Sequence, residues 1–274
     1  MATLTELSNA RELMVNLTLR ELRGKYKRSI LGWTWSLFNP LVTMAIFTVV
    51  FLVFLRVRIP PGDPSGMNVF AFYLLCGLLP WNFLANGMNG GMTALINNAT
   101  LIQKVYFPRE ILVAANVASW LVSLLIELAV FAVALLIAGN MVLPWLPAVV
   151  VLVAVQAMFV VGIGLLLSVL NVYFRDVQHL MAILLQLWFY STPIVYPLTV
   201  VPTTVELFGF DLPLRAIYEL NPMVRFVEAY RDLLYDLRIP PVGDLGYLLV
   251  VSALALAIGL LVFNRLEPKL AEEL

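Results

Sequence analysis

Six long apolar runs constrain what this chain can fold into. They lie near residues 38–56, 69–91, 112–138, 145–170, 180–197 and 244–264. Each is about as long as the ~20 residues that an α-helix needs to cross the hydrocarbon core of a bilayer. Because 62% of the 274 residues are hydrophobic and only 12% are charged, the composition exceeds what a soluble domain buries. The sequence therefore predicts an all-α integral membrane protein with six transmembrane helices.

A cluster of cations before the first run predicts its orientation. Five lysines and arginines fall between Arg20 and Arg28, and two tryptophans follow before the run begins. Cations next to a membrane helix mark its cytosolic end, and tryptophans favour the headgroup level. Six spans return the C-terminus to the cytosol, and most of the 17 lysines and arginines then fall inside. We expect a multi-pass protein of the plasma (cytoplasmic or inner) membrane with both termini in the cytosol.

The N-terminal segment, within residues 1–34, predicts an interfacial helix over residues 4–22. Its two faces differ in polarity at helical spacing, as is typical of a helix that lies on an anionic leaflet. The polar face carries Asn9, Glu12, Asn16, Arg20 and Arg23. The apolar face carries Leu4, Leu7, Ala10, Met14 and Leu17, with Arg11 and Glu21 as exceptions. The alternative is a solvated helix that packs against a partner.

Segment 198–243, between the fifth and sixth runs, predicts two short outer helices, interfacial or re-entrant. Asn221-Pro222 is typical of a helix start, because Asn caps the first turn and Pro suits the first helical position. The helix to about Leu237 places apolar residues on one side, and its charged residues are expected to lie away from them. The apolar side is Phe226, Val227, Tyr230 and Leu234, and the charged side is Glu228, Arg231, Asp232 and Asp236. Residues 213–220 also predict a short helix, and both helices should border a cavity.

Motifs of enzymes are absent from the sequence. It has no phosphate-binding loop, no nucleophile elbow and no zinc-protease motif. One cysteine and one histidine exclude a disulfide framework and make a structural metal site unexpected. The net charge of zero gives no indication of nucleic acid. We expect neither a catalytic nor a metal site, and no cofactor on this chain. Glu127 is the one clear ionisable residue inside a run, with either a functional or a helix-joining role.

The loop at residues 98–110 predicts a cytosolic docking surface. A short helix after Asn98, stopped by Pro108, would present four apolar residues with cations around them. The apolar residues are Leu101, Ile102, Val105 and Phe107, and the cations are Lys104 and Arg109. Exposed apolar residues rimmed by charge indicate a protein contact. The alternative is a loop packed against the chain's own helices.

Three motifs carry a resemblance to a known family. They are Tyr26-Lys27-Arg28-Ser29-Ile30-Leu31-Gly32 with Trp33, Trp35 and Pro40 behind it, the loop from Asn98-Ala99 to Phe107-Pro108-Arg109-Glu110, and Asn221-Pro222 followed by Tyr230-Arg231-Asp232. Arg175-Asp176 after the fourth run also fits. In this order and spacing, the whole chain resembles the membrane subunits of type-2 ABC exporters of the polysaccharide and polyol-phosphate class. That class exports O-antigen, galactan or teichoic acid.

The resemblance implies a homodimer of six-helix subunits, a single transmembrane domain over residues 1–274, with two copies of a separate ATPase that holds ATP and Mg. It implies a glycan on a polyprenyl diphosphate as the substrate, threaded between the subunits. The loop looks like a coupling helix, with Asn98, Leu101, Ile102, Lys104, Val105, Phe107, Pro108, Arg109 and Glu110 as its residues. The outer helices look like gate helices, with Asn221, Pro222, Tyr230, Arg231 and Asp232 as their residues.

Two residue groups are candidates for substrate contact. Aromatic rings give a sugar apolar contact that is not directional. The candidate channel rings are Phe47, Phe51, Phe54, Trp188, Phe189, Tyr190 and Tyr196. The candidate pyrophosphate ligands are Arg23, Lys25, Lys27 and Arg28. The alternatives are packing or lipid contact for the rings, and a signal for helix orientation alone for the cations.

Three other functions share parts of this pattern. A type-2 ABC permease for a small drug or lipid would have the same fold and partner. An integral-membrane glycosyl or phosphoryl transferase needs clustered acids or a metal, whereas the cytosolic acids here are scattered. A secondary transporter would show inverted repeats with paired broken helices, and the two halves show no convincing repeat.

Overall fold

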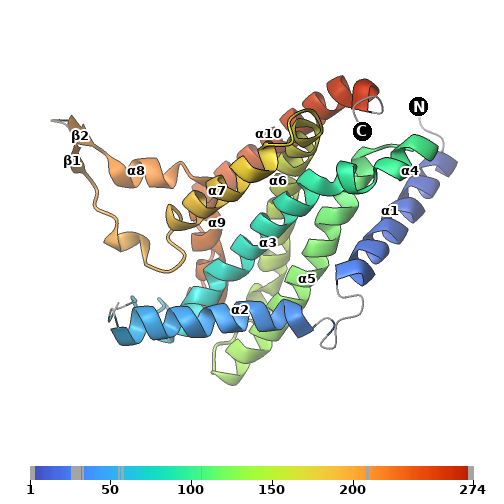
Figure 1. Ribbon diagram of the computed structural model, residues 1–274. Helices are drawn as coiled ribbons and strands as arrows, with labels where there is room; N and C mark the ends of the chain where they lie inside the picture. Colours follow the sequence, from blue (N-terminus) through green and yellow to red (C-terminus); the bar gives the residue numbers. More distant parts are fainter. Residues whose placement is uncertain are drawn as a thin grey trace.

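The protein is mostly helical in the computed structural model, which describes residues 4–25, 32, 34–54, 56, 59–105, 107–207 and 210–270 (Figure 1). The α-helices are α1 (Leu4–Lys25), α2 (Thr34–Phe47), α3 (Phe70–Asn97), α4 (Ala99–Lys104), α5 (Glu110–Ile137), α6 (Leu146–Tyr173), α7 (Val177–Tyr190), α8 (Leu214–Glu219), α9 (Pro222–Arg231) and α10 (Val242–Leu266). Short 3-10 or π turns are η1 (Thr48–Phe54), η2 (Leu143–Trp145), η3 (Leu198–Val200), η4 (Asp232–Asp236) and η5 (Glu267–Lys269). An antiparallel hairpin of β1 (Val205–Leu207) and β2 (Phe210–Leu212), which the sequence patterns did not indicate, precedes α8.

Five helical segments of the described chain are long and apolar enough to cross a membrane. They are Leu37–Phe54, Phe70–Asn97, Glu110–Ile137, Leu143–Tyr173 and Val242–Leu266. The fifth predicted run forms only α7, which has 14 residues and ends at Tyr190. The expected end at residue 197 was therefore too late. The helix stops before Pro193, where proline removes a backbone donor and disfavours helical geometry for the residue before it.

Four long helices (α3, α5, α6 and α10) run side by side and form the body of the protein (Figure 1). The contact between α6 and α10 depends on Gly162 and Gly259, whose backbones touch: a Cβ on either glycine would overlap backbone atoms of the other helix. On another face of α6, Gly164 meets Gly91 of α3 in a similar close approach. Small residues at such crossings let membrane helices pack closely.

Helix α9 lies inside this body, which corrects the expected placement of its charged side. Met223, Phe226 and Tyr230 are fully buried, and Arg231 and Asp232 are also only 2% and 4% exposed. The helix packs against α3, α6 and α10. It begins at Pro222 with Asn221 as its cap, as predicted, and continues into the π turn η4, which ends at Asp236 with Leu237 as its C-cap. Arg231 and Asp232 can be buried because Ile194, Tyr73 and Arg238 provide partners from outside α9.

Helix α1 packs along α5, with a contact face different from the predicted one. Leu17 and Leu22 are buried, whereas Met14, expected on the apolar face, is exposed. Glu21, which broke the predicted pattern, lies on the contact face and accepts a hydrogen bond from Asn116 Nδ2 of α5 at 3.3 Å. The face of α1 that packs on α5 therefore differs from the predicted apolar face. It includes Glu21 and Lys25, because α5 offers polar partners for both side chains.

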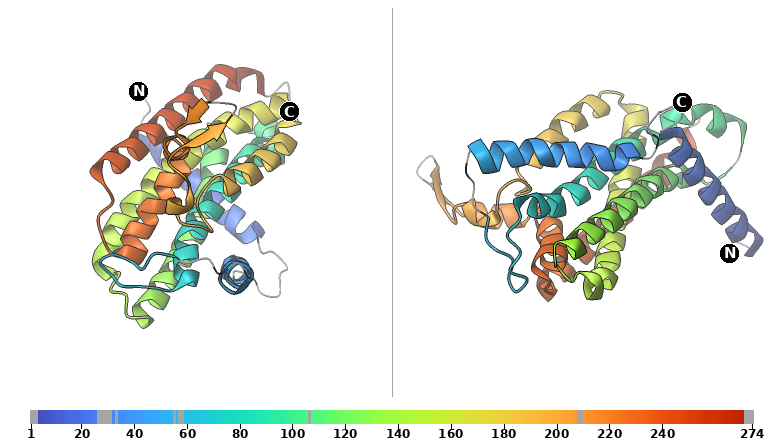
Figure 2. Two further views of the ribbon diagram at one scale, coloured as in Figure 1. Left: turned by 90° about the vertical axis from the view of Figure 1, so that its left-hand side faces the viewer. Right: turned by 90° about the horizontal axis from the view of Figure 1, so that it is seen from below.

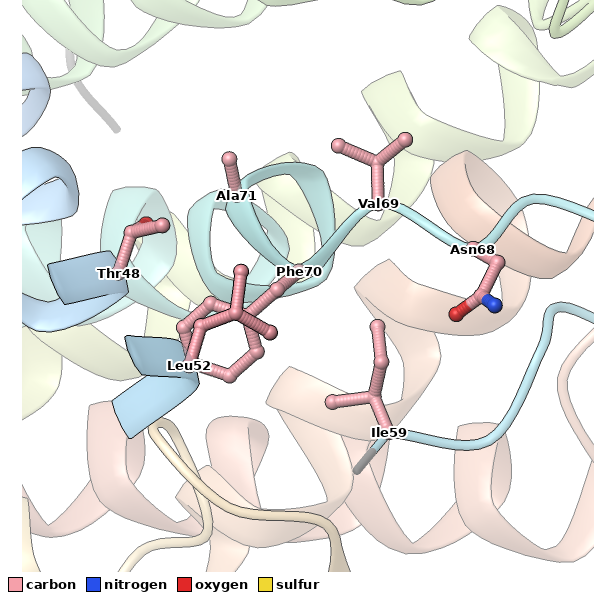
Figure 3. Close-up of a pocket in the computed structure, with 7 residues that line it drawn as sticks. All are labelled: Thr48, Leu52, Ile59, Asn68, Val69, Phe70 and Ala71. Carbon is pink, nitrogen blue, oxygen red and sulfur yellow. The ribbon is translucent and has the colours of Figure 1, made fainter. Parts of the chain in front are cut away.

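The two ends of the bundle carry different parts of the chain. Both termini and α4 lie at one end, whereas the β hairpin lies far from them (Figures 1 and 2). Helix α2 runs along the periphery, and η1 buries no residue. A cleft of about 550 Å³ lies where η1 faces the start of α3, between Thr48 and Leu52 on one side and Ile59 and Asn68–Ala71 on the other (Figure 3).

Candidate functional site

The inner loop forms the expected short helix, but its exposed apolar surface is smaller than predicted. Helix α4 follows Asn98 and ends at Lys104, before Pro108 is reached. Ile102 and Phe107 are buried in an apolar cluster with residues of α3, α5, α6 and α10, and Leu101 is partly buried beside it. Val105 is 52% exposed, next to the exposed Gln103 and Lys104. The contact with the chain's own helices therefore uses three of the four apolar residues and leaves Val105 exposed.

Two hydrogen bonds hold this loop to the chain's terminal segments. Arg20 Nη2 of α1 donates to Asn98 Oδ1 at 2.6 Å. Arg109 Nη1 donates to the carbonyl oxygen of Glu267 in η5 at 2.7 Å. Glu110 begins α5, where a carboxylate is favourable beside the positive end of the helix dipole. A displacement of the loop would thus reach α1 and η5 through these hydrogen bonds, and α5 through the chain itself.

The cationic cluster is only partly within the described residues. Arg23 is exposed, and its neighbour Arg20 forms an ion pair with Glu21 at 2.9 Å. Lys25 is half-buried, with its Nζ 3.3 Å from the centre of the Trp120 ring and 3.5 Å from Ser123 Oγ. Burial lowers the pKa of Lys25 to about 7, against the opposing effect of Glu21 and Glu127. Lys27 and Arg28 lie outside the described residues.

Glu127 lies in a polar strip that sequence reasoning found only in part. A small cleft brings its carboxylate together with polar side chains of α3 and α5, namely Asn82, Asn86, Trp120 and Ser123. Lys25 is close enough to interact electrostatically with Glu127. The sequence signal for this strip was Asn82 and Asn86, because a spacing of four residues puts two side chains on one face of a helix.

Most of the predicted aromatic residues form one cluster. Phe47 stacks on Phe189 with ring centres 6.1 Å apart, and Phe51 contacts Phe47 at 5.9 Å. Trp81, which the sequence analysis did not single out, joins Trp188 and Phe189 at 6.1 and 5.5 Å. The cluster thus connects α2, α3 and α7.

The remaining predicted rings lie at or beyond the edge of this cluster. Tyr190 contacts Phe189 at 5.3 Å, and Tyr196 donates from its hydroxyl to the Tyr190 carbonyl oxygen at 2.8 Å. Phe54 is 72% exposed and makes no ring contact within the described chain. Phe54 lies apart from Phe47 and Phe51 because the π turn η1 alters the angular step between successive side chains.

Asn221 connects the end of α7 to the start of α9. Its Oδ1 accepts hydrogen bonds from Met223 N at 3.0 Å and from Trp188 Nε1 at 2.7 Å. Its Nδ2 donates to Thr192 Oγ1 at 3.1 Å. This side chain therefore links the aromatic cluster, through Trp188, to the start of α9.

The Tyr230-Arg231-Asp232 motif makes contacts in three directions. Tyr230 donates from its hydroxyl to Gln156 Oε1 of α6 at 2.9 Å. Arg231 donates to Glu228 Oε1 at 2.7 Å and to the Ile194 carbonyl oxygen at 2.8 Å, and its guanidinium lies 3.8 Å from the centre of the Tyr73 ring. Asp232 accepts from Arg238 Nε at 2.6 Å. Burial raises the pKa of Asp232 to about 6, although the Arg238 guanidinium opposes this shift.

Within the described part of the chain, no group of three or more His, Cys, Asp or Glu side chains has an arrangement that could hold a metal ion. Cys76 is buried within α3. The polar groups of the described chain are arranged along helices and at the two ends of the bundle. The bundle with its five long apolar helical segments is the architecture of a membrane protein.

Comparison with known proteins agrees with this reading. The chain matches a family model described as ABC-2 type transporter over residues 12–235. The O-antigen export system permease protein RfbA of Myxococcus xanthus is 31% identical over 98% of this chain and 98% of its own length. A protein of the same name from Klebsiella pneumoniae is 30% identical, over 95% of this chain and 94% of its own. The polysialic acid transport protein KpsM of Escherichia coli is 26% identical over 92% of each.

Proposed function

Because the chain belongs to the ABC-2 type transporter family, as the permease subunit of a type-2 ABC exporter, we propose that it forms the membrane passage for a polysaccharide. The observation that carries the proposal is similarity over nearly the full length to permeases named for O-antigen export. The chain is a transport component and not an enzyme. We infer that the polymer crosses the membrane on a polyprenyl-diphosphate lipid. A small drug or lipid as cargo is the alternative.

We propose that two copies assemble around the passage in the inner membrane, with α7 as a sixth span and both termini in the cytosol. The exposed apolar faces of α2 and α7 support this assembly, since they leave large side chains without a partner in one copy. These side chains are Phe38, Ile46 and Val53 of the α2–η1 segment and Leu180, Ile183 and Leu187 of α7. The aromatic cluster between α2, α3 and α7 would then border the passage. The outer segment with α8 and α9 would border its exit as a gate.

The loop at α4 is proposed to receive the movement of a separate ATPase subunit that holds ATP and Mg. We expect Val105→Asp to weaken ATPase binding by about tenfold or more, because a charge would replace the exposed apolar contact. Copurification of the ATPase and the ratio of ATP hydrolysed to polymer exported measure this effect. Gln103→Asp is the matched control, since it adds the same charge on an exposed side chain of the same loop. Equal behaviour of the two variants would contradict an apolar contact at Val105.

The cations before α2 are proposed to bind the pyrophosphate of the lipid-linked substrate. Arg binds phosphate oxygens in a bidentate manner, whereas Lys acts as a point charge. We therefore expect Arg23→Lys combined with Arg28→Lys to abolish most export while membrane insertion stays normal. The measurement is lipid-linked polymer accumulating inside the cell. Arg11→Lys, an exposed position on the same helix, should have no effect. Full export in the double variant would mean that these cations only orient the first membrane helix.

The proposed function is tested by deleting the gene in its own host. We expect the surface polysaccharide to disappear and its lipid-linked form to accumulate on the cytosolic side, where added glycosidase reaches it only after cells are opened. Restoring the gene on a plasmid should reverse both effects. Normal surface polysaccharide in the deletion strain would refute polysaccharide export.

A further inference from the structure

The turn between α6 and α7 exposes an aromatic side chain at the end of the bundle that also carries α4 and both termini (Figure 1). Phe174, the C-cap of α6, is 65% exposed, and Arg175 and Asp176 beside it are exposed too. Among the described residues neither of these two charges has an ion-pair partner, whereas all four arginines of segment 198–243 are paired. The turn thus presents one large apolar side chain next to two unpaired charges.

The length of α6 places this turn beyond the apolar layer of a bilayer. Helix α6 has 28 residues and is therefore about 42 Å long, whereas the hydrocarbon core is about 30 Å thick. The excess of about 10 Å lies at the end with Phe174, because the opposite ends of α5 and α6 expose the apolar side chains Ile137, Met141 and Leu143, as suits contact with lipid. Lipid tails therefore do not cover Phe174.

The turn is joined to the loop after α4 through the end of α10. The Leu266 carbonyl oxygen accepts a hydrogen bond from the Tyr173 hydroxyl at 3.4 Å. The next carbonyl oxygen along the chain, that of Glu267, accepts from Arg109 Nη1 at 2.7 Å. The last turn of α6 and the α4 loop also pack in the same apolar cluster. A partner that touches the α4 loop is therefore close to the α6–α7 turn.

The partner that fits this surface is the ATPase subunit, which the exporter family implies. The adjoining side chain of Val105 is proposed above as its contact, so this step rests on the proposed function. Exposed cations accompany both apolar side chains: Lys104 lies beside Val105, Arg175 beside Phe174, and Arg265 at the end of α10 between them in the chain of contacts. An apolar groove rimmed by carboxylates complements such a surface.

We propose that Phe174 and Arg175 form a second contact for the ATPase subunit, next to the α4 loop. Phe174 enters an apolar groove of that subunit, and Arg175 pairs with a carboxylate at the rim of the groove. Helix α7 begins at Val177, directly after the turn, and carries Trp188 and Phe189 of the aromatic cluster. The contact therefore joins the ATPase to the helix that holds these rings.

Photocrosslinking in the assembled permease–ATPase complex in nanodiscs identifies what covers Phe174. The photoreactive p-benzoylphenylalanine is placed at Phe174, at Val105 and, as the control, at Ile239, which is 68% exposed between η4 and α10. We expect adducts with the ATPase from Phe174 and Val105 and none from Ile239, identified by the masses of the joined chains. An adduct at Phe174 only with a second copy of this chain, or only with lipid, would overturn the proposal.

Substitutions test whether the contact contributes to binding. Phe174→Asp should weaken ATPase binding by about tenfold or more, whereas Phe174→Leu should retain it. Arg175→Glu should also weaken binding by about tenfold, and Arg175→Lys should retain most of it. Ile239→Asp is the matched control, since it places the same charge on an equally exposed apolar side chain. Titration of labelled ATPase onto nanodiscs measures the affinity, and the thermal midpoint checks folding. Parental affinity in folded Phe174→Asp and Arg175→Glu would contradict the contact.

The two probe positions allow this proposal and the proposed function to fail separately. ATPase adducts from Val105 but not from Phe174 would refute the second contact and leave the α4 loop as the docking surface. ATPase adducts from Phe174 in a complex that exports no polysaccharide would refute the function and leave the contact. Absence of ATPase adducts from both positions would refute both contacts.

Discussion

Replacing Gly162 or Gly259 by alanine is expected to disrupt the protein more than any other single methyl group added to the bundle. A Cβ at Gly162 would overlap backbone atoms of Ala255 and Leu256, and one at Gly259 would overlap the Gly162 carbonyl. Backbone atoms of packed helices cannot move aside as a flexible side chain can. We expect each variant to lose about 3 kcal/mol, the upper end of the range for overpacked cores. The thermal midpoint of the purified protein in detergent should fall by about 10 °C.

Two other glycines of α10 provide the control for this prediction. Gly243 and Gly246 lie in the first turns of α10, and a Cβ at either would meet no atom within 4 Å. Their replacement by alanine should leave the midpoint unchanged or slightly higher, since alanine favours the helix by about 1 kcal/mol over glycine. If all four variants behave alike, α6 and α10 do not cross at the closeness described here.

Replacing Gln156 by leucine is expected to produce the second largest loss of stability. The Gln156 side chain is fully buried and joins three helices, because its Nε2 donates to the Pro80 carbonyl oxygen at 2.8 Å and its Oε1 accepts from Tyr230 at 2.9 Å. Leucine leaves the buried Tyr230 hydroxyl without a partner, which costs about 1–3 kcal/mol. The midpoint of thermal unfolding and the yield of monodisperse protein measure this loss.

A double variant distinguishes the lost hydrogen bond from a packing effect. Gln156→Leu combined with Tyr230→Phe removes both partners, so the pair should be more stable than Gln156→Leu alone. Gln178→Leu makes the same exchange at an exposed position of α7 and should have little effect. A double variant that is less stable than either single variant would show that Tyr230 and Gln156 act independently.

The helices could be predicted from the sequence because their length and apolar composition follow from the bilayer alone. Five of the six runs form helical segments long enough to cross it, and Gly139, with its positive φ, follows the end of α5. The cap at Asn221 was also predictable, since it depends only on its own turn. Local chemistry is enough for such features.

The burial of α9 could not be predicted, because it depends on distant partners. A charged residue on an amphipathic pattern is expected to face solvent, yet Arg231 is buried since Glu228, Ile194 and Tyr73 surround its guanidinium. The burial of Ile102 and Phe107 also depends on distant residues, because both pack into the apolar cluster formed with α3, α5, α6 and α10. The contact between Gly162 and Gly259 cannot be recognised from the sequence of α6 or of α10 alone, because it depends on how the two helices cross.

The central claim is tested most directly by ATP-driven transport into inside-out membrane vesicles. Vesicles that contain this chain and its ATPase are supplied with labelled lipid-linked polysaccharide on their outer surface, which corresponds to the cytosolic face. We predict that ATP, but not a non-hydrolysable analogue, moves the polymer into the lumen, where added glycosidase cannot reach it. Val105→Asp should abolish this protection, and Gln103→Asp should retain it. Polymer that stays accessible to the glycosidase, with both subunits assembled and ATP being hydrolysed, would contradict the account.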